Sequence, residues 1–387
     1  MSHTRSIQAA GAGVVAAGAL IAAFAGTAPA SAQTIPTPWP STGSSASAMP
    51  HRNVPFGSTP AAGTAARLPG TSCTAFPADN IWHADISAAP VNPMSAQWLS
   101  NMQASTRKLH PDFGPSGDPN NPYGIPITVV TAAHAVVPVA FDYASESDQV
   151  KYPLGSDTKI EGGANSGGDM HALIVNATTC ELYETWDTRQ LSNGTWAAGS
   201  GAVWNLASDA LRPAGWTSAD AAGLPIMPGL LRYDEVLSGN VDHAIRFTTN
   251  ITSTAYVWPA RHEAGSTSSS AYPPMGAWFR LRANYPTAGL LPATVTIIRA
   301  MQHHGLILAD NGSPWFFQGT ADDNWPNTVL DQLKQIPASS FQAIDVSYLQ
   351  QSANSGATKH IPPARAISAA VGWCTRPGAL PTRGPCG

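Results

Sequence analysis

The sequence predicts a mainly β domain, a β-sandwich or jelly-roll-like fold with a few bracing helices. Short runs of β-branched and aromatic residues, such as 126–132 and 180–187, are separated by segments that contain Pro and Gly. This spacing is typical of sandwiches and barrels, whereas a doubly wound sheet would alternate its strands with long helices. The dipeptide Asn193-Gly194 follows the second of these runs and predicts a β-hairpin there.

Further strands and three helices follow from local patterns. The other strand-like runs are 135–141, 243–248, 254–259, 277–283 and 313–319. Helices are expected over 94–105, over 292–304 and from about Pro326. In the second helix Val295, Ile298 and Met301 share one face, and Gly305 ends the pattern. We expect these helices to brace the sheets from outside.

Three segments divide the chain. Residues 1–32 match a cleavable secretory signal, because Arg5 precedes an apolar, Ala-rich run and small residues precede Gln33. Residues 33–72 are mostly Pro, Ser, Thr, Ala and Gly without apolar periodicity, which predicts a disordered linker. Residues 73–387 are expected to form a single β-rich globular domain, since no repeat or second linker interrupts them.

Charge and hydropathy narrow the partners that the sequence predicts. The formal net charge is -4, and removal of the signal with Arg5 makes the balance one unit more acidic. Such a protein is not expected to bind nucleic acid by its overall charge. No second apolar run approaches the roughly 20 residues that cross a bilayer. We therefore expect a secreted, extracellular protein, a monomer without membrane attachment once the signal is cleaved.

The four cysteines predict two disulfides. An even number in an exported chain favours pairing, and of the three possible arrangements we expect Cys73 with Cys180 and Cys374 with Cys386. The second pair would close a short C-terminal loop rich in Pro and Gly. None of the cysteines has the CxxC spacing of a zinc site.

Two short stretches carry the first candidate catalytic residues. The Gly-rich segment 161–171 leads into a strand, and Asp169 and His171, two positions apart, would point to the same face. Asp234 and Glu235 are adjacent in what we interpret as a strand, so at most one of them would enter a cleft. Glycoside hydrolysis needs two carboxyls, so the second would come from elsewhere, such as Glu184 or Asp169. The first stretch is equally compatible with a plain surface loop, and paired acids beside a turn, as in the second, are more often ordinary surface residues.

A further group of polar residues follows along the chain. His243 and His262 are candidate catalytic residues, and the candidate substrate-binding residues are Tyr233, Arg246, Arg261, Trp258, Trp315 and Trp325. Arginine can neutralise a uronate carboxylate while histidine or tyrosine removes a proton, which suits a polysaccharide lyase. The same groups suit a hydrolase that binds sugar, with the indoles as stacking faces. The arginines could instead be paired with carboxylates in a structural network.

A metal site is the weaker interpretation of the histidines. His171, His243 and His262, with Asp169, could converge on a metal ion, but their separation gives no ligand-spacing signature. We therefore expect no metal and no cofactor. The segment 161–171 lacks the endings of a nucleotide-binding loop, and the chain has no GxSxG motif of an α/β-hydrolase.

Several segments resemble a known group of proteins. Residues 76–82, 210–236, 256–265, 273–276 and 309–313 resemble a group of exported bacterial proteins of actinobacterial type. The likeness spans most of residues 73–341. It implies a common fold and export, and it transfers no activity to these residues.

The sequence leaves three functional hypotheses. The first is a secreted carbohydrate-active enzyme, a hydrolase or a lyase acting on an extracellular polysaccharide. The alternative is a non-catalytic glycan-binding or cell-surface protein, in which the aromatic and Asn-rich loops are the whole function. A metal-dependent hydrolase that uses the histidines is the third. Convergence of the candidate acids and histidines in one cleft would favour catalysis.

Overall fold

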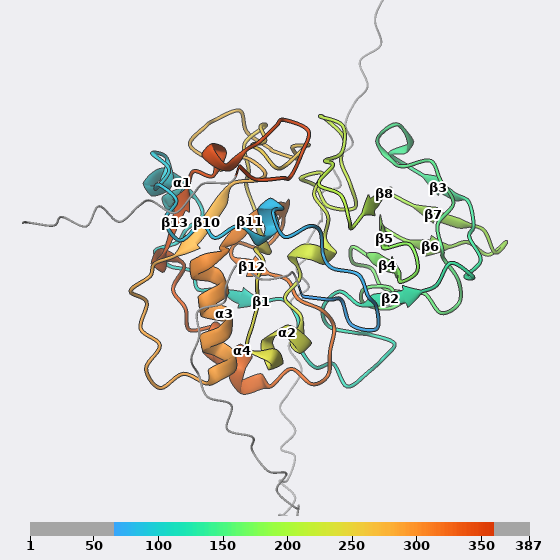
Figure 1. Ribbon diagram of the computed structural model, residues 1–387, viewed down its shortest axis with the longest axis horizontal. Coiled ribbons are helices and arrows are strands. Elements are labelled where there is room, and N and C mark those ends of the chain that lie inside the picture. The colour runs from blue at the N-terminus through green and yellow to red at the C-terminus, as the bar shows by residue number, and fades with distance from the viewer. Residues whose placement is uncertain (1–65, 360–387) are drawn as a thin grey trace, which may run out of the picture. The chain divides into compact units, whose positions relative to one another are not determined.

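The computed structural model describes residues 66–359 and has a mainly β architecture (Figure 1). Its strands form three sheets and outnumber a few short helices, so the predicted fold class is confirmed at this level. A sandwich or jelly roll is not confirmed, because the sheets mix parallel and antiparallel pairs. The expected signal peptide, nearly all of the expected linker, and Cys374 with Cys386 lie outside the described residues.

The largest sheet has six strands in the order β1-β12-β9-β11-β10-β13. These are β1 (His110–Pro111), β12 (Phe316–Phe317), β9 (Ile245–Thr249), β11 (Leu306–Asn311), β10 (Trp278–Leu281) and β13 (Phe341–Ile344). Its central strands β9 and β11 are buried on both faces, and β11 accordingly begins with a continuous apolar run instead of polar alternation. The short strands β11 and β13 were not among the predicted runs.

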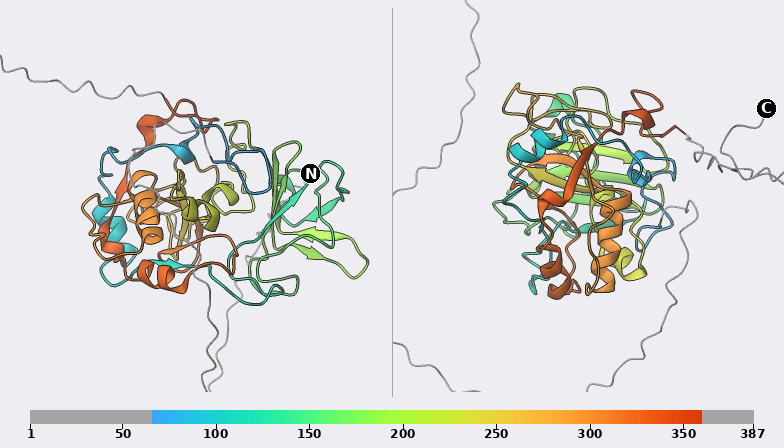
Figure 2. Two further views of the ribbon diagram at one scale, coloured as in Figure 1. Left: turned by 60° about the horizontal axis from the view of Figure 1, so that its bottom comes forward. Right: turned by 90° about the vertical axis from the view of Figure 1, so that its left-hand side faces the viewer.

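Two smaller sheets lie at one side of the molecule, away from helices α3 and α4 (Figure 2). One has the order β2-β4-β5-β8 and the other β3-β7-β6. Their strands are β2 (Ile127–Val130), β3 (Val139–Phe141), β4 (Ala172–Asn176), β5 (Glu181–Trp186), β6 (Arg189–Gln190), β7 (Trp196–Ala198) and β8 (Ser200–Asn205). Asn193-Gly194 lies between β6 and β7, as predicted for a hairpin. These sheets enclose a small core of their own, while one face of β4 and β5 packs into the main core.

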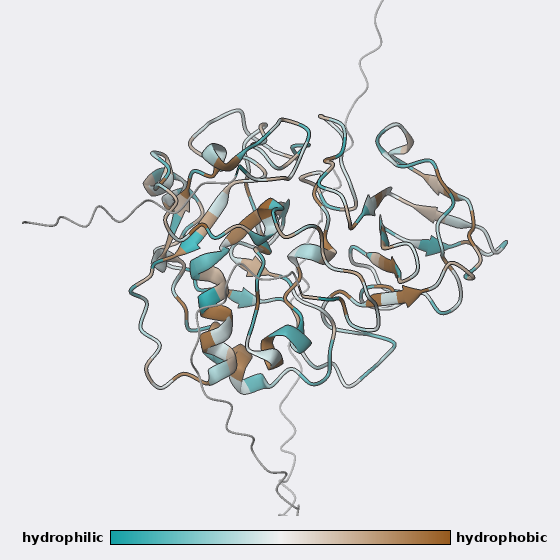
Figure 3. Ribbon diagram, viewed as in Figure 1, coloured by the Kyte–Doolittle hydropathy of each residue, from teal (hydrophilic) through white to brown (hydrophobic). Residues whose placement is uncertain are grey.

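Among the described residues, three of the four α-helices are at predicted places: α1 (Ser95–Asn101), α3 (Pro292–His303) and α4 (Asn327–Leu333). Apolar and polar residues alternate along α3 in Figure 3, and its buried residues include Ile297, Ile298 and Met301. Gly305, just after this helix, has a positive φ of 78°, which favours glycine. No helix of residues 66–359 is long and apolar enough to span a membrane.

The prediction of a strand over 231–236 was wrong. Residues Tyr233–Ser238 form helix α2, because Glu235 at the third helical position accepts a hydrogen bond from the Arg232 amide at 2.7 Å. Acidic residues in the first turn also suit the positive end of a helix, and Gly239 ends it with a φ of 81°. The run 254–259 is likewise no strand and contributes one isolated bridge, at Tyr256.

The start of the folded region is anchored by a disulfide. Cys73 is bonded to Cys180, which confirms this predicted pair. Residues 66–72 were assigned to the linker, but Leu68 is buried and its amide donates to the carbonyl oxygen of Cys73 at 2.8 Å. Residues 66–72 therefore belong to the folded region rather than to the linker.

We expect that replacing both Cys73 and Cys180 by Ser lowers the free energy of unfolding by about 2–4 kcal/mol. The bond joins positions 107 residues apart, so its loss frees a long loop of the unfolded chain. Equilibrium urea unfolding of the parent protein and of the double variant would measure the difference. An unchanged free energy would show that packing of Leu68 and its neighbours suffices to hold this segment.

Candidate functional site

A row of polar residues crosses one face of the large sheet. Pro111 pairs with Phe317, and Phe317 with Phe247, so the neighbouring positions Asp112, Gln318 and Arg246 align across three strands. Cross-strand neighbours share a face of a sheet. Their side chains therefore face the same side, where Asp112 and Arg246 lie close enough to Glu161 for their charges to interact.

Asp310 extends this row onto β11. It pairs with Thr248, which lies two positions after Arg246, so the side chains of Asp310 and Arg246 point to the same face of the sheet. Its Oδ2 atom is 3.7 Å from Nη2 of Arg246, and its side chain is 24% exposed. Asp310 thus combines contact with a buried cation and access to solvent.

Arg246 is fixed by Asp220 in a buried, bidentate ion pair. Nε donates to Oδ2 at 3.0 Å and Nη2 to Oδ1 at 2.8 Å. Burial opposes the charge, but Asp220 outweighs it and holds the pKa of Arg246 above its ordinary value. One edge of the guanidinium is therefore occupied, and Arg246 acts as a fixed positive charge next to Asp310.

Glu161 and His171, at the two ends of the Gly-rich segment 161–171, contact each other next to the loop that carries Asp220. Nδ1 of His171 lies 2.5 Å from Oε2 of Glu161, and Nε2 lies 3.2 Å from the carbonyl oxygen of Ala219, next to Asp220. Gly163 has a φ of 89°, and a Cβ there would collide with the carbonyl oxygen of Asn120. His171 is buried, whereas the Glu161 side chain is 26% exposed.

The carboxyls of this cluster differ in acidity. Burial and the nearby Asp220 raise the pKa of Asp310 to about 7, against the opposing charge of Arg246. Burial would also raise the pKa of Glu161, but its pairing with His171 outweighs this and lowers it. Burial lowers the pKa of His171 less than Glu161 raises it, and the net value is about 9. At neutral pH Glu161 is ionised, His171 is charged and Asp310 is about half protonated.

At the β1 end of the row, Asp112 and Gln318 are joined by Tyr123. Burial raises the pKa of Asp112, and the hydroxyl of Tyr123 donates to its Oδ1 atom at 3.2 Å. Burial and Asp112 raise the pKa of Tyr123 to about 12. The Oε1 atom of Gln318 is buried and has no hydrogen-bond donor among the described residues. An unsatisfied buried acceptor is costly, so a donor supplied by water or ligand would be favourable there.

The structure places Asp234, Glu235 and His243 in a different group. Glu235 Oε1 lies 3.0 Å from Nε2 of His243, and its Oε2 lies 2.7 Å from Nη2 of Arg232. All three of these paired side chains are buried, whereas that of Asp234 is 48% exposed. Glu235 of α2 and His243 therefore form a buried ion pair, without the solvent access that a substrate requires.

Arg261 and His262 flank the segment that carries Asp220. The Arg261 guanidinium donates to the carbonyl oxygens of Arg212 and Ala353 and to the Asn354 side chain. His262 Nδ1 is 2.8 Å from the carbonyl oxygen of Ala221. Arg261 thus holds loops together through carbonyl and amide oxygens, whereas the structural interpretation of the arginines expected pairing with carboxylates.

The four aromatic candidates pack against protein. Trp315 and Trp325 are buried, so neither offers an open stacking face. The ring of Tyr233 packs at 5.3 Å against Trp325. The indole nitrogen of the half-buried Trp258 donates to the carbonyl oxygen of Ser355. Sequence alone could not separate these core rings from exposed ones.

The three candidate histidines are held by different partners, namely Glu161, Glu235 and the Ala221 carbonyl. Within residues 66–359 no group of three or more His, Cys, Asp and Glu side chains is arranged to hold a metal ion. The structure therefore does not bring His171, His243, His262 and Asp169 together as a ligand set.

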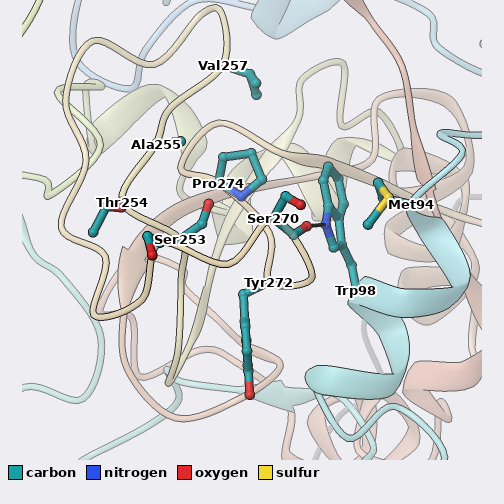
Figure 4. Close-up of a pocket in the computed structure, with 10 residues that line it drawn as sticks. Met94, Trp98, Ser253, Thr254, Ala255, Val257, Ser270, Tyr272 and Pro274 are labelled. Atoms are coloured by element: carbon teal, nitrogen blue, oxygen red, sulfur yellow. Dashed lines mark hydrogen bonds between the residues drawn. The ribbon is translucent and has the colours of Figure 1, made fainter.

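A recess of about 190 Å³ lies elsewhere, against helix α1 (Figure 4). Its walls include Trp98 of α1 and Tyr272, together with serines and threonines of the segments that follow β9. Trp98 packs on Phe279, which faces away from the Arg246 side of the sheet. None of the lining residues has a carboxyl or an imidazole, so this recess lacks the groups for acid–base chemistry.

Sequence reasoning found part of the site. It selected Asp169, His171 and Arg246, but not Glu161, Asp220, Asp310 or Asp112 as site residues. Glu161 lies at the start of the selected Gly-rich segment, and Asp310 in a stretch of Asp, Asn and aromatic residues. Asp220 lies in a loop without a distinguishing pattern, and no signal in the sequence marks it.

Comparison with known proteins gives no match to a family model, to a curated protein or to a solved structure. The functional argument therefore depends on the geometry of the site.

Proposed function

We propose that the protein is a secreted carbohydrate-active hydrolase that acts on an extracellular polysaccharide, with Asp310 as its general acid. The observation that carries the proposal is the pair of partly exposed carboxyls near Arg246. The pKa of Asp310 is raised to about 7, while that of Glu161 is lowered. Glycoside hydrolases use two carboxyls whose environments separate their pKa values in this way.

In this proposal Asp310 donates its proton to the leaving oxygen of the scissile glycosidic bond. Glu161, ionised and oriented by the His171 imidazolium, acts on the opposite side as base or nucleophile. Arg246 is held by Asp220, so it keeps its position while charge changes at Asp310. The Oε1 atom of Gln318 has no hydrogen-bond donor among the described residues, so in this proposal it accepts a hydrogen bond from a substrate hydroxyl.

The protonation states favour hydrolysis over elimination. A lyase base must be unprotonated when it removes a carbon-bound proton. His171, with a pKa of about 9, and Tyr123, with a pKa of about 12, are both protonated at neutral pH. The bidentate edge of Arg246 already binds Asp220 and does not offer itself to a uronate carboxylate.

Secretion is part of the same proposal. It rests on the expected signal peptide, and the disulfide between Cys73 and Cys180 is compatible with an oxidising, extracellular setting. The alternative function, a glycan-binding protein without catalysis, shares this location and the same fold. Turnover therefore decides between the two.

The test is hydrolysis of a panel of soluble polysaccharides as a function of pH. We expect kcat/KM to rise as Glu161 ionises and to fall above about pH 7 as Asp310 loses its proton. New reducing ends without unsaturated sugars would identify hydrolysis. Unsaturated products would contradict it in favour of a lyase, and binding without either product would leave the glycan-binding alternative.

A further inference from the structure

Trp186 lies beside the acid cluster at the end of β5. Thr185 pairs with Ala172, so Trp186 stands opposite His171, one position beyond the residues paired between β4 and β5. The indole nitrogen donates to Oδ1 of Asp169 at 3.4 Å. Asp169 is in turn close enough to His171 to raise its pKa. An aromatic ring and an exposed carboxylate thus adjoin the proposed catalytic groups.

A second aromatic residue, Tyr143, lies next to Trp186. The ring centroids are 6.3 Å apart with an interplanar angle of 48°, and Tyr143 is 54% exposed. Gly199 holds both residues, because its amide donates to the Trp186 carbonyl and its carbonyl accepts from the Tyr143 amide. A Cβ at position 199 would collide with the Trp186 ring, so glycine allows the indole to lie against the backbone.

Polar groups border this pair of rings. Asp187 and Arg189 form an ion pair just beyond Trp186, and Asp169, whose carbonyl oxygen accepts from the Asp187 amide, lies next to them. Sugars present apolar C–H faces to aromatic rings and hydroxyls to surrounding carboxylates and guanidinium groups. A purely apolar partner would leave these charges desolvated at a cost. The combination of an exposed Tyr143 ring, a half-buried Trp186 ring and a charged rim therefore suits a sugar more than an apolar protein surface.

We propose that Tyr143 and Trp186 form the sugar-binding subsite next to the catalytic cluster, with Asp169 as a hydrogen-bond acceptor for a ring hydroxyl. The proposal rests on the proposed function for its substrate class, a polysaccharide. It assigns the stacking role to residues other than Trp258, Trp315 and Trp325. The subsite would position one sugar unit of the polysaccharide beside Glu161 and Asp310.

The test compares Tyr143→Ala, Trp186→Ala and Trp186→Phe in the full protein. Binding to each soluble polysaccharide of the panel is measured by affinity electrophoresis, and KM and kcat are measured on any that is hydrolysed. We expect each alanine variant to weaken binding about tenfold or more, because it removes a large apolar contact area. Trp186→Phe keeps a ring and should recover part of the affinity. Tyr348→Ala, at another half-exposed tyrosine, is the matched control.

The outcomes separate this inference from the proposed function. If the parent protein hydrolyses a polysaccharide while Tyr143→Ala and Trp186→Ala keep its KM and binding, the subsite is refuted and the hydrolase stands. If no glycan is cleaved, yet one is bound and both alanine variants lose it, the subsite stands and the hydrolase falls. A protein that binds no glycan of the panel overturns both. Tyr143 is largely exposed, so its variant tests the subsite even if Trp186→Ala fails to fold.

Discussion

The variant Asp310→Asn should lose about 100-fold or more of its hydrolytic activity, the scale expected when a general acid is removed. The amide keeps the shape of the side chain next to Arg246 but has no acidic proton to donate. Because the pKa of about 7 belongs to Asp310, the fall in kcat/KM above neutral pH should disappear from the residual activity. Initial rates from pH 4 to 9, measured as new reducing ends, would show both effects.

Asp331→Asn is the control for this substitution. Asp331 lies on α4, its side chain is 68% exposed, and it pairs with Lys334. The change removes the same charge without touching the cluster, so activity and pH profile should match those of the parent protein. An Asp310→Asn variant that retains full activity, with an unchanged alkaline limb, would exclude Asp310 as the acid.

Glu235→Gln should affect stability more than chemistry. The substitution leaves Arg232 and His243 buried without the carboxylate that pairs with both of them. Breaking a buried ion pair by removing one partner costs about 3–5 kcal/mol. Thermal unfolding should shift down by roughly 6 °C or more for a domain of this size. Activity per folded molecule should remain, in contrast to the expectation that Glu235 is catalytic.

The loss should depend on pH in a definite direction. Burial raises the pKa of Glu235, but the charges of His243 and Arg232 lower it by more, so the net pKa lies below its ordinary value. The stabilisation from Glu235 is therefore lost as pH falls through this lowered pKa. Burial lowers the pKa of His243, but Glu235 raises it by more, so the net pKa lies above its ordinary value and the stabilisation is lost as pH rises through it. The difference in stability between the parent protein and the Glu235→Gln variant should therefore be largest between about pH 4.5 and 6.5, the ordinary pKa values of the two groups.

Asp234→Asn provides a neighbouring comparison in the same helix turn. Asp234 Oδ1 is 3.3 Å from Nε of Arg232, but the side chain is 48% exposed. Exposed ion pairs contribute at most about 1 kcal/mol, so this variant should unfold near the parent temperature. Equal unfolding temperatures for the two variants would contradict the structural role that we assign to Glu235.

Local patterns predicted the elements whose stabilisation is local. Helix α3 follows from its apolar periodicity and from Gly305, and the hairpin between β6 and β7 from Asn193-Gly194. The strand prediction for 231–236 was wrong because a short apolar run fits a strand or a helix equally well. The hydrogen bond from the Arg232 amide to the Glu235 carboxylate favours the helix. Strand β11 is central and buried, so it lacks the alternation that marks a strand.

The candidate site was predictable only where its residues lie in an unusual local segment. Asp169 and His171 stand out through the glycines around them, and Arg246 through its position in an apolar run. Asp220 and Asp310 join them through long-range pairing, since they approach Arg246 from segments far apart in the sequence. Their pKa values depend on that burial, which no spacing in the sequence encodes.

Four consecutive residues, Ala219 to Ala222, join the two cores of the domain to the candidate site. The Ala219 carbonyl contacts His171 of the smaller lobe, by which we mean the part of the domain built on the two smaller sheets. Asp220 holds Arg246 of the large sheet, and the Ala222 amide donates to the carbonyl of Ala309, next to Asp310. Partial opening of the smaller lobe would withdraw Glu161 and His171 from Asp310 and so separate the two carboxyls. Such opening would remove the His171 charge that lowers the pKa of Asp310, and slow hydrogen exchange at the Ala222 amide would report that residues 219–222 remain attached to β11.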